Sequence, residues 1–185
     1  MEPPTTEASL VLLTTPDLGA RARELRALFD EAWQGDDGFD DEDWTHAMGG
    51  THFLMEIGGT VRSHVSVVPR TLVTSGRALQ TGYVEAVATL ERDRGRGYAS
   101  ELMPAATDLI DERYELGALG TGLFDFYARF GWKRWRGPTS VRTDDGEVLT
   151  PHEDGFVMVH RTPATPAGLD LDAPISCDWR PGDVW

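Results

Sequence analysis

The chain has 185 residues, enough for one domain with a substantial core but short for two, so we expect a single domain over residues 1–185. Its 31 acidic and 17 basic residues give a formal net charge of -14, which argues against a nucleic-acid partner because phosphate binding requires clustered Lys and Arg. This surplus of carboxylates fits either a solvated acidic surface or a binding site for a polycation.

The first sixteen residues contain a short apolar run without a basic leader or a small-residue cleavage site. No stretch approaches the roughly 20 apolar residues that a membrane span requires. We therefore expect a cytoplasmic protein that does not engage a membrane. Cys177 is the only cysteine, which excludes an internal disulfide and a cysteine-built zinc site, and we expect it to be buried rather than nucleophilic.

Residues 14–33 predict a first helix, with Thr15 as the N-cap, Pro16 at the first helical position and an apolar stripe that ends at Phe29. Residues 36–43 follow, with six carboxylates and no basic residue. Two strands over residues 51–72 are then predicted around the turn at Gly58 and Gly59.

The remaining elements alternate between strands and helices. A strand over 78–90 leads into a helix over 95–115, in which Pro104 marks a kink or an early boundary. After them we expect a buried strand over 116–120, a short helix over 123–130 and late strands over 131–135 and 155–162. The order predicts an α/β or α+β protein with one mixed sheet.

The segment "ERDRGRGYAS" begins within a few residues of the strand over 78–90 and opens the next helix. Its R-x-x-G-x-G pattern comprises Arg92, Gly95 and Gly97. Glycines let the backbone turn close to a ligand, and the first amides of a helix point at an anion, so a pyrophosphate fits here. The alternative is a glycine-rich turn with solvated arginines. A Rossmann site is a poorer match, because the glycine spacing differs.

Farther along, "YARFGW" places Tyr127 four residues before Gly131 and an aromatic residue. With this pair of motifs the sequence resembles the GCN5-related N-acetyltransferases (GNAT), which bind acetyl-coenzyme A at such a loop. Within that superfamily, "GYVEAVA", "YELGAL", "GPTSV" and "CDWRPGDVW" resemble the aminoglycoside 2'-N-acetyltransferases. The resemblance runs from about Phe29 to the last residue. It implies a GNAT fold, in which helices flank one mixed sheet that opens into a V-shaped cleft for acetyl-CoA.

The resemblance also implies roles for residues of the strand over 78–90. Alternation places Tyr83, Glu85 and Val87 on one face of that strand. Glu85 is expected to contact the aminoglycoside and, through water, to help deprotonate its amine; the alternative is an ion pair with an arginine across the sheet. The Val87 N–H is expected to stabilise the developing oxyanion, and Tyr127 to protonate the leaving thiolate unless it only fills core space. The expected cofactor contacts are Val87, Arg92, Arg94, Gly95, Arg96, Gly97, Tyr98, Ala99 and Tyr127.

For the substrate, the resemblance points to carboxylates and to the end of the chain. One of Asp36 and Asp37 is a candidate contact, although most of the acidic run is equally interpretable as a solvated face. Relatives carry a longer, serine-bearing segment where Gly120 or Thr121 stands here, and an aspartate where Glu153 stands. Trp179 and Trp185 are expected to anchor the chain end, so that its α-carboxylate reaches the substrate. The full set of expected substrate contacts is Asp36, Asp37, Asp43, Glu85, Gly120, Glu153, Asp183 and Trp185.

The function implied is acetyl transfer from acetyl-CoA to the 2'-amine of an aminoglycoside by direct attack, which would inactivate the antibiotic. Acetylation of another small amine or polyamine is the first alternative, and a non-catalytic CoA-binding regulatory module is the second. A homodimer is expected from the resemblance. No metal is expected, because the five histidines are dispersed and lack H-E-x-x-H spacing.

Overall fold

The computed structural model describes residues 7–34 and 38–185. Asp36 and Asp37, the two alternative substrate contacts, lie outside these ranges. In the described part of the chain, no helix is both long and apolar enough to cross a membrane.

The residues group into two compact units. The first unit comprises Met1–Val68 and Val84–Ala106, and the second comprises Pro69–Tyr83 and Thr107–Trp185. Three elements contribute residues to both units: β3 (Thr60–Thr74), β4 (Arg77–Thr89) and α3 (Tyr98–Arg113). The expectation of a single domain stays a prediction.

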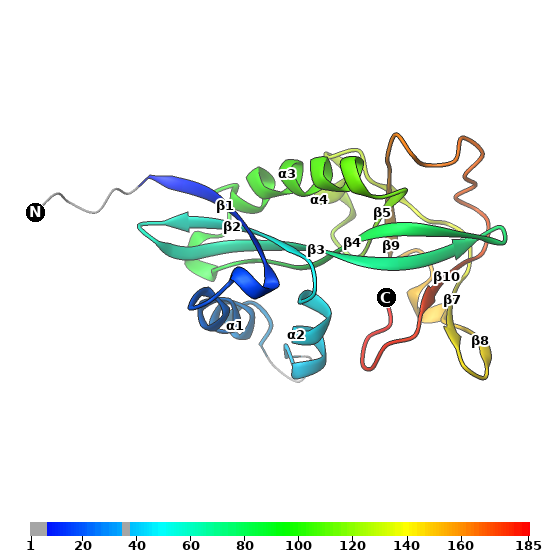
Figure 1. Cartoon of the computed structure of the whole chain (residues 1–185), viewed down its shortest axis with the longest axis horizontal. Helices are drawn as coiled ribbons and strands as arrows, with labels where there is room; N and C mark the ends of the chain where they lie inside the picture. The colour runs from blue at the N-terminus through cyan, green and yellow to red at the C-terminus, as the bar shows by residue number, and fades with distance from the viewer. Residues whose placement is uncertain (1–6, 35–37) are drawn as a thin grey trace, which may run out of the picture. The chain divides into compact units, whose positions relative to one another are not determined.

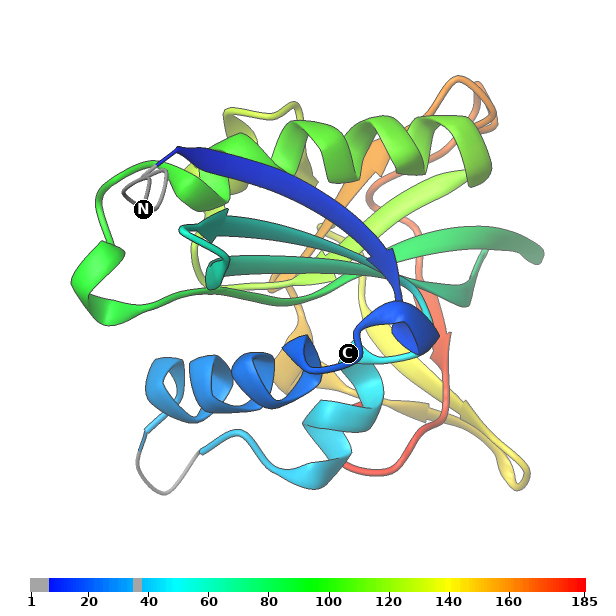
Figure 2. The ribbon, with the colours of Figure 1, turned by 60° about the vertical axis from the view of Figure 1, so that its left-hand side comes forward.

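In the first unit, β1 (Ala8–Thr14) pairs antiparallel with β2 (Thr51–Ile57), which pairs antiparallel with β3. The β2–β3 turn at Gly58 and Gly59 is confirmed, and both glycines have positive φ, of 57° and 75°. In both views α1 (Arg21–Ala32) and α2 (Asp41–Ala47) lie on one side of β2 and β3, with the first turns of α3 on the other (Figures 1 and 2). The sequence analysis predicted neither β1 nor α2.

The predicted cap of the first helix is wrong. Thr15 begins a separate 3-10 turn, η1 (Thr15–Asp17), whereas α1 begins at Arg21 after an Ala20 N-cap that makes no side-chain bond. Gly19 separates the two with a φ of 55°, a left-handed conformation that a continuous helix does not allow. The Thr15 hydroxyl is instead bonded to the His52 ring and to the Gly49 amide.

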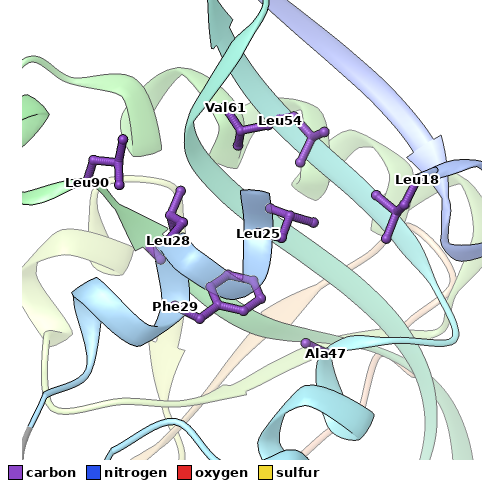
Figure 3. Close-up of a cluster of buried hydrophobic side chains, with 9 residues drawn as sticks. Leu18, Leu25, Leu28, Phe29, Ala47, Leu54, Val61 and Leu90 are labelled. Atoms are coloured by element: carbon purple, nitrogen blue, oxygen red, sulfur yellow. The ribbon is translucent and has the colours of Figure 1, made fainter. Parts of the chain in front are cut away.

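The apolar stripe of α1 is confirmed as the centre of a core cluster in this unit (Figure 3). Leu25, Leu28 and Phe29 are at most 1% exposed, and they pack with Leu54 of β2 and Val61 of β3. Half-buried aromatic rings extend the cluster around Phe29, whose ring centroid lies 4.7 Å from that of Phe39 and 6.0 Å from that of Trp44. The cluster thus fixes α1 and α2 against the strands that carry part of the candidate site.

In the second unit, β5 (Leu116–Gly120) runs parallel to β4 and antiparallel to β9 (Val157–Arg161), which also pairs with β6 (Lys133–Arg134). The predicted strands at these positions are confirmed, as is a short helix, α4 (Phe124–Ala128). Three further strands were not predicted: β10 (Ile175–Asp178) joins β3 to β7 (Thr139–Thr143), and β8 (Gly146–Leu149) forms a hairpin with β7. The 3-10 turns η2 (Glu91–Asp93) and η3 (Pro151–Glu153) complete the described elements.

The helix predicted over 95–115 is observed as α3, and it continues through Pro104 to Arg113, so Pro104 does not end it. Ten strands of the described chain are hydrogen-bonded into one sheet with both parallel and antiparallel neighbours. The predicted class, helices on a mixed sheet, is therefore confirmed.

Candidate active site

The glycine-rich loop is a tight turn that leads into α3. Gly95 and Gly97 have φ of 78° and 87°, and a Cβ built on either one meets nothing within 4 Å. These positions therefore favour glycine for its backbone conformation, and the space beside them is open. The first i→i−4 bond of α3 runs from the Glu101 amide to the Gly97 carbonyl at 3.0 Å, so the amides of Tyr98 and Ala99 belong to the turn whose N–H groups point out of the helix.

Two arginines of the loop and one of β3 surround a buried carboxylate that the sequence analysis did not single out. Asp93 is 7% exposed, and its oxygens lie 3.4 Å from Arg62, 3.7 Å from Arg92 and 3.4 Å from Arg96. The side chains of Arg92 and Arg96 are nevertheless 62% exposed. Asp93 therefore holds the guanidinium groups of Arg92 and Arg96 without removing them from solvent. The loop is cationic because its three arginines outnumber its two carboxylates, Glu91 and Asp93.

These features fit a diphosphate. The positive φ of the glycines, the open space beside them, the helix N-terminus and the exposed guanidinium groups are what main-chain binding of an anion requires. Arg94 is also exposed, and its Nη2 donates to the Ala32 carbonyl at 3.5 Å. The residues present are thus suited to the diphosphate of coenzyme A.

Ala86 interrupts the regular alternation of β4. It has a φ of 48°, a left-handed conformation that residues with a Cβ rarely adopt. As a result Glu85, Ala86 and Val87 are all half-buried, whereas Val84 and Ala88 on either side are buried. The strict alternation expected for this strand is therefore wrong at Ala86, because the irregular residue turns the chain out of its regular pleat.

Side chains of β3 hold the carbonyl groups of this irregular stretch. Ser66 donates to the Glu85 carbonyl at 3.1 Å, Ser63 donates to the Ala88 carbonyl at 2.8 Å, and Nδ1 of His64 lies 2.7 Å from the Ala86 carbonyl oxygen. Nε2 of His64 lies 2.9 Å from Nδ1 of His52, and both rings are fully buried. Burial lowers the pKa of His52 to about 4 and that of His64 to about 3, so both rings are neutral at pH 7.

The acidic residues before α2 have local structural partners. The Asp40 carboxylate accepts from the amides of Glu42 and Asp43, and the Asp43 carboxylate accepts from the Asp40 amide at 3.1 Å, which completes a capping box. Asp41 forms an ion pair with Arg26 at 2.7 Å. Much of the acidic run therefore caps and fastens α2, and a substrate contact by half-buried Asp43 stays a prediction.

In the second unit, Tyr127 is 6% exposed and packs edge-on against Phe126 and Trp132. Burial raises the pKa of its phenol to about 12. The group therefore keeps its proton at neutral pH and has the protonation state of a donor.

Two of the expected substrate carboxylates in this unit influence each other. The pKa of Glu153 is raised, first by burial and then by the negative charge of Asp183, while His152 at 3.3 Å opposes the shift. A cation placed beside the pair would relieve this repulsion. Residues 30 positions apart in the sequence thus contribute to one negative region, which fits the binding of an ammonium group.

Of the two tryptophans expected to anchor the last described residues, only Trp185 is buried. Trp185 is 5% exposed and its indole N–H donates to the Thr150 hydroxyl at 3.0 Å, whereas Trp179 is 58% exposed, so its expected role as an anchor is wrong. Nη2 of Arg180 lies 3.4 Å from the main-chain oxygen of Trp185. A Cβ on Gly120 would lie 3.6 Å from the Tyr83 hydroxyl and 3.7 Å from the same oxygen of Trp185.

The predicted residues therefore fall into two sets. The first unit contains Val87 and Glu85, the loop from Arg92 to Ala99, and Asp43; the second contains Gly120, Tyr127, Glu153, Asp183 and Trp185. In the described ranges, no group of three His, Cys, Asp or Glu side chains is placed to hold a metal ion. Cys177 is buried as expected, and burial raises its pKa to about 11.

Sequence comparison identifies the family to which these features belong. Residues 20–135 match the acetyltransferase (GNAT) domain family. The chain is also 42% identical over 179 residues to an aminoglycoside 2'-N-acetyltransferase from Mycolicibacterium fortuitum, which covers 94% of this chain and 90% of that protein. The chain belongs to the GNAT acetyltransferase family. The family resemblance inferred from the sequence is thereby confirmed.

Solved structures agree with the fold of this GNAT acetyltransferase. An Escherichia coli GNAT family N-acetyltransferase in complex with CoA matches with a TM-score of 0.66 and 18% identity, covering 96% of this chain and 93% of that one. A Brucella melitensis GNAT family acetyltransferase in complex with acetyl-CoA matches with a TM-score of 0.54 and 18% identity, covering 69% and 84%. A Kribbella flavida relative matches with a TM-score of 0.59 and 19% identity; 72% of this chain is covered, but only 34% of that one.

The neutral buried histidines of this acetyltransferase predict a pH-dependent stability. Below about 6.5 the unfolded chain protonates His52 and His64, while the folded chain keeps them neutral down to about 4 and about 3, so the free energy of unfolding should fall as the pH decreases from 7 to 5. Each histidine contributes up to about 1.4 kcal/mol per pH unit in this range. Urea denaturation at both pH values should show a smaller decrease for the His52→Asn/His64→Asn double variant. An equal decrease would contradict the assignment of neutral rings.

Proposed function

We propose that this acetyltransferase moves the acetyl group of acetyl-CoA to the 2'-amine of an aminoglycoside. The observation that carries the proposal is the 42% identity, over nearly the full length of both chains, to an enzyme of that name from Mycolicibacterium fortuitum. The amine nitrogen forms a bond to the thioester carbon, the carbon–sulfur bond breaks, and one proton leaves the nitrogen while another is delivered to sulfur. The chain's own residues have to bind both partners and manage these two protons.

The loop of Gly95 and Gly97 binds the diphosphate of the donor through main-chain amides. Its open glycines, with φ of 78° and 87°, allow that approach, and the helix N-terminus favours the negative charge. Arg92, Arg94 and Arg96 supply positive charge around the loop, which matters in a chain whose net charge is -14. The acetyl donor itself supplies the activated thioester.

Three groups act at the reacting atoms. The N–H of Val87, next to the irregular Ala86, stabilises the negative charge that develops on the acetyl oxygen. Glu85 accepts the amine proton through a water molecule, for which its half-buried position is suitable. Tyr127 donates to the departing sulfur, and its pKa of about 12 keeps the phenol protonated for that purpose.

Carboxylates and main-chain oxygens bind the other ammonium groups of the aminoglycoside. Glu153 and Asp183 are the strongest candidates, because burial and the negative charge of Asp183 raise the pKa of Glu153 and a cation beside them would oppose that shift. Asp43 and the main-chain oxygen of Trp185 are further candidates, and Gly120 borders that oxygen. A carboxylate beside the reacting amine would be a disadvantage, because every unit by which the amine pKa rises adds about 1.4 kcal/mol to deprotonation.

The proposal extends to the setting in which the reaction takes place. Acetylation of the 2'-amine inactivates the antibiotic and gives resistance in the cytoplasm, where acetyl-CoA is made and used. The working form is a homodimer, in keeping with the family resemblance. Sedimentation of the purified protein measures the oligomeric state.

Replacing Gly97 by alanine should weaken CoA binding roughly tenfold, or about 1.4 kcal/mol, because an alanine at a φ of 87° is strained and shifts the loop. Gly59→Ala is the matched control: its φ is 75°, its Cβ also meets nothing within 4 Å, and it lies in the β2–β3 turn. Calorimetric titration with CoA should show the loss only for Gly97→Ala. The same loss in both variants would mean that the effect is general destabilisation.

Tyr127→Phe should lower kcat roughly 100-fold, at the lower end of the range for a positioned general acid, with little change in either KM. Tyr114→Phe is the control, since Tyr114 is a half-buried tyrosine of the same unit whose pKa is also raised by burial. Steady-state kinetics with both substrates separates the two effects. A higher KM at unchanged kcat would assign Tyr127 to binding rather than to proton transfer.

The direct test of the function is acetyl transfer over a panel of aminoglycosides with and without a 2'-amine, followed by mass spectrometry of the products. We expect acetylation of the drugs that carry the 2'-amine and at that nitrogen. Transfer to another ring position, or transfer only to simple polyamines included in the panel, would overturn the proposal in favour of a different amine substrate.

A further inference from the structure

A continuous chain of hydrogen bonds runs through the first unit from exposed Gly49 to half-buried Ala86, and the bond between its two histidines is buried. The Gly49 amide donates to the Thr15 hydroxyl at 2.9 Å, and that hydroxyl lies 2.8 Å from Nε2 of His52. Nδ1 of His52 lies 2.9 Å from Nε2 of His64, and Nδ1 of His64 lies 2.7 Å from the Ala86 carbonyl oxygen. The chain joins four segments that are distant in the sequence, and it ends at the one described non-glycine residue of β4 with positive φ.

The two ends of this chain determine where every proton lies. A carbonyl oxygen only accepts, so Nδ1 of His64 must carry the hydrogen that points at Ala86. A neutral ring has one such hydrogen, which leaves Nε2 of His64 as an acceptor and requires Nδ1 of His52 to donate to it. Nε2 of His52 then accepts from the Thr15 hydroxyl, whose oxygen accepts from the Gly49 amide. All four bonds point toward Ala86, and both histidines are the Nδ1–H tautomer.

The peptide group at the end of the chain is shared with the neighbouring residue. The carbonyl of Ala86 and the N–H of Val87 belong to one planar unit, so a bond that fixes the orientation of the first also fixes the second. A hydrogen bond to the carbonyl oxygen further polarises the peptide and strengthens its N–H as a donor, by about 10–30% per bond in estimates for such chains. The left-handed conformation at Ala86 has to be held by its surroundings, and this bond is part of that support.

We propose that His64, supported by His52, is a positioning residue for catalysis that aims and strengthens the Val87 N–H through the Ala86 carbonyl. The inference rests on the proposed function, in which that N–H receives the developing charge of the acetyl oxygen. His64 itself stays away from the reacting atoms, because its ring is fully buried and both of its nitrogens are engaged within the protein.

A histidine suits this position better than a hydroxyl. Ser66 and Ser63 hold the carbonyls of Glu85 and Ala88 on either side, but a serine hydroxyl can rotate to another acceptor. The His64 ring cannot, because Phe29 packs edge-on against it with centroids 5.0 Å apart and His52 engages its other nitrogen. The direction of the donor at Ala86 is therefore set by packing on one side and by a hydrogen bond on the other.

The first arm of the test does not depend on the substrate. Long-range proton–nitrogen NMR spectra of the labelled protein at pH 7 should show the Nδ1–H tautomer for both His52 and His64. A hydrogen on Nε2 of His64 would overturn the proposal, since no proton would then face Ala86. Because the NMR measurement uses only the folded protein, it tests the His64 proposal even if the enzyme acetylates an unexpected amine or none.

The second arm separates a catalytic contribution from a structural one. His64→Leu should lower kcat about tenfold, less than the 10²–10³ reported for removing an oxyanion donor outright, with the KM for acetyl-CoA and for the aminoglycoside changed less than about twofold. His64→Asn should recover most of the rate, because its amide nitrogen takes the place of Nδ1 and can donate to Ala86. An unchanged kcat in His64→Leu, or equal losses in both variants, would overturn the proposal.

His52→Leu provides a milder variant if His64→Leu fails to fold. It leaves Nδ1 of His64 within reach of Ala86 but removes the donor that keeps Nε2 of His64 free of hydrogen. We expect kcat to fall about threefold, less than for complete loss of a donor, together with a mixed tautomer signal for His64. A wild-type rate together with a mixed tautomer would show that the direction of the chain is irrelevant to catalysis, against the proposal.

Discussion

The left-handed backbone of Ala86, in the half-buried part of β4, is the constraint on which the site depends. A non-glycine residue adopts a φ of 48° only where its surroundings hold it, at a cost of roughly 1–3 kcal/mol. Here Ser63, His64 and Ser66 of the adjacent strand bond the carbonyls of β4 at and around that residue. The strain lies next to the amide that we assign to the developing charge and to the carboxylate that we assign to the amine proton.

The local balance of charged groups, rather than the net charge of the chain, determines which parts of this protein attract anions or cations. The chain has a net charge of -14, yet the loop before α3 is cationic because Arg92, Arg94 and Arg96 outnumber its two carboxylates, Glu91 and Asp93. Near α2 the carboxylates of Asp40 and Asp43 act in a helix cap, whereas Glu153 and Asp183 repel each other. A cation beside Glu153 would oppose the rise in its pKa, whereas Asp40 and Asp43 already accept hydrogen bonds in the cap, so acidic composition alone does not distinguish these carboxylates.

The sequence predicted the elements and residues whose signals are local. The β2–β3 turn, the strand through Glu85, the glycine loop and α3 follow from glycines, alternation and periodicity, and the family resemblance assigned chemistry to them. The short strands β7, β8 and β10 were missed because their sequences lack a clear period. The cap at Thr15 was misjudged because Gly19 breaks the helix and the hydroxyl bonds a histidine instead.

Contacts between distant residues were beyond prediction for a different reason. His64 meets its two partners across 12 and 22 positions, and Arg62 meets Asp93 across 31. No local pattern distinguishes such histidines from others that are merely buried. Their role becomes visible only when the terminal acceptor is identified as a carbonyl, since that observation fixes the direction of every bond in the chain.

The most direct test of the central claim is a crystal structure of the protein with acetyl-CoA. The account predicts that the acetyl oxygen lies about 2.7–3.1 Å from the nitrogen of Val87, with the diphosphate on the amides between Gly95 and Ala99. It also predicts that the Ala86 carbonyl still faces His64 in the complex. An acetyl oxygen held by another donor, or an Ala86 peptide turned away from His64, would contradict it.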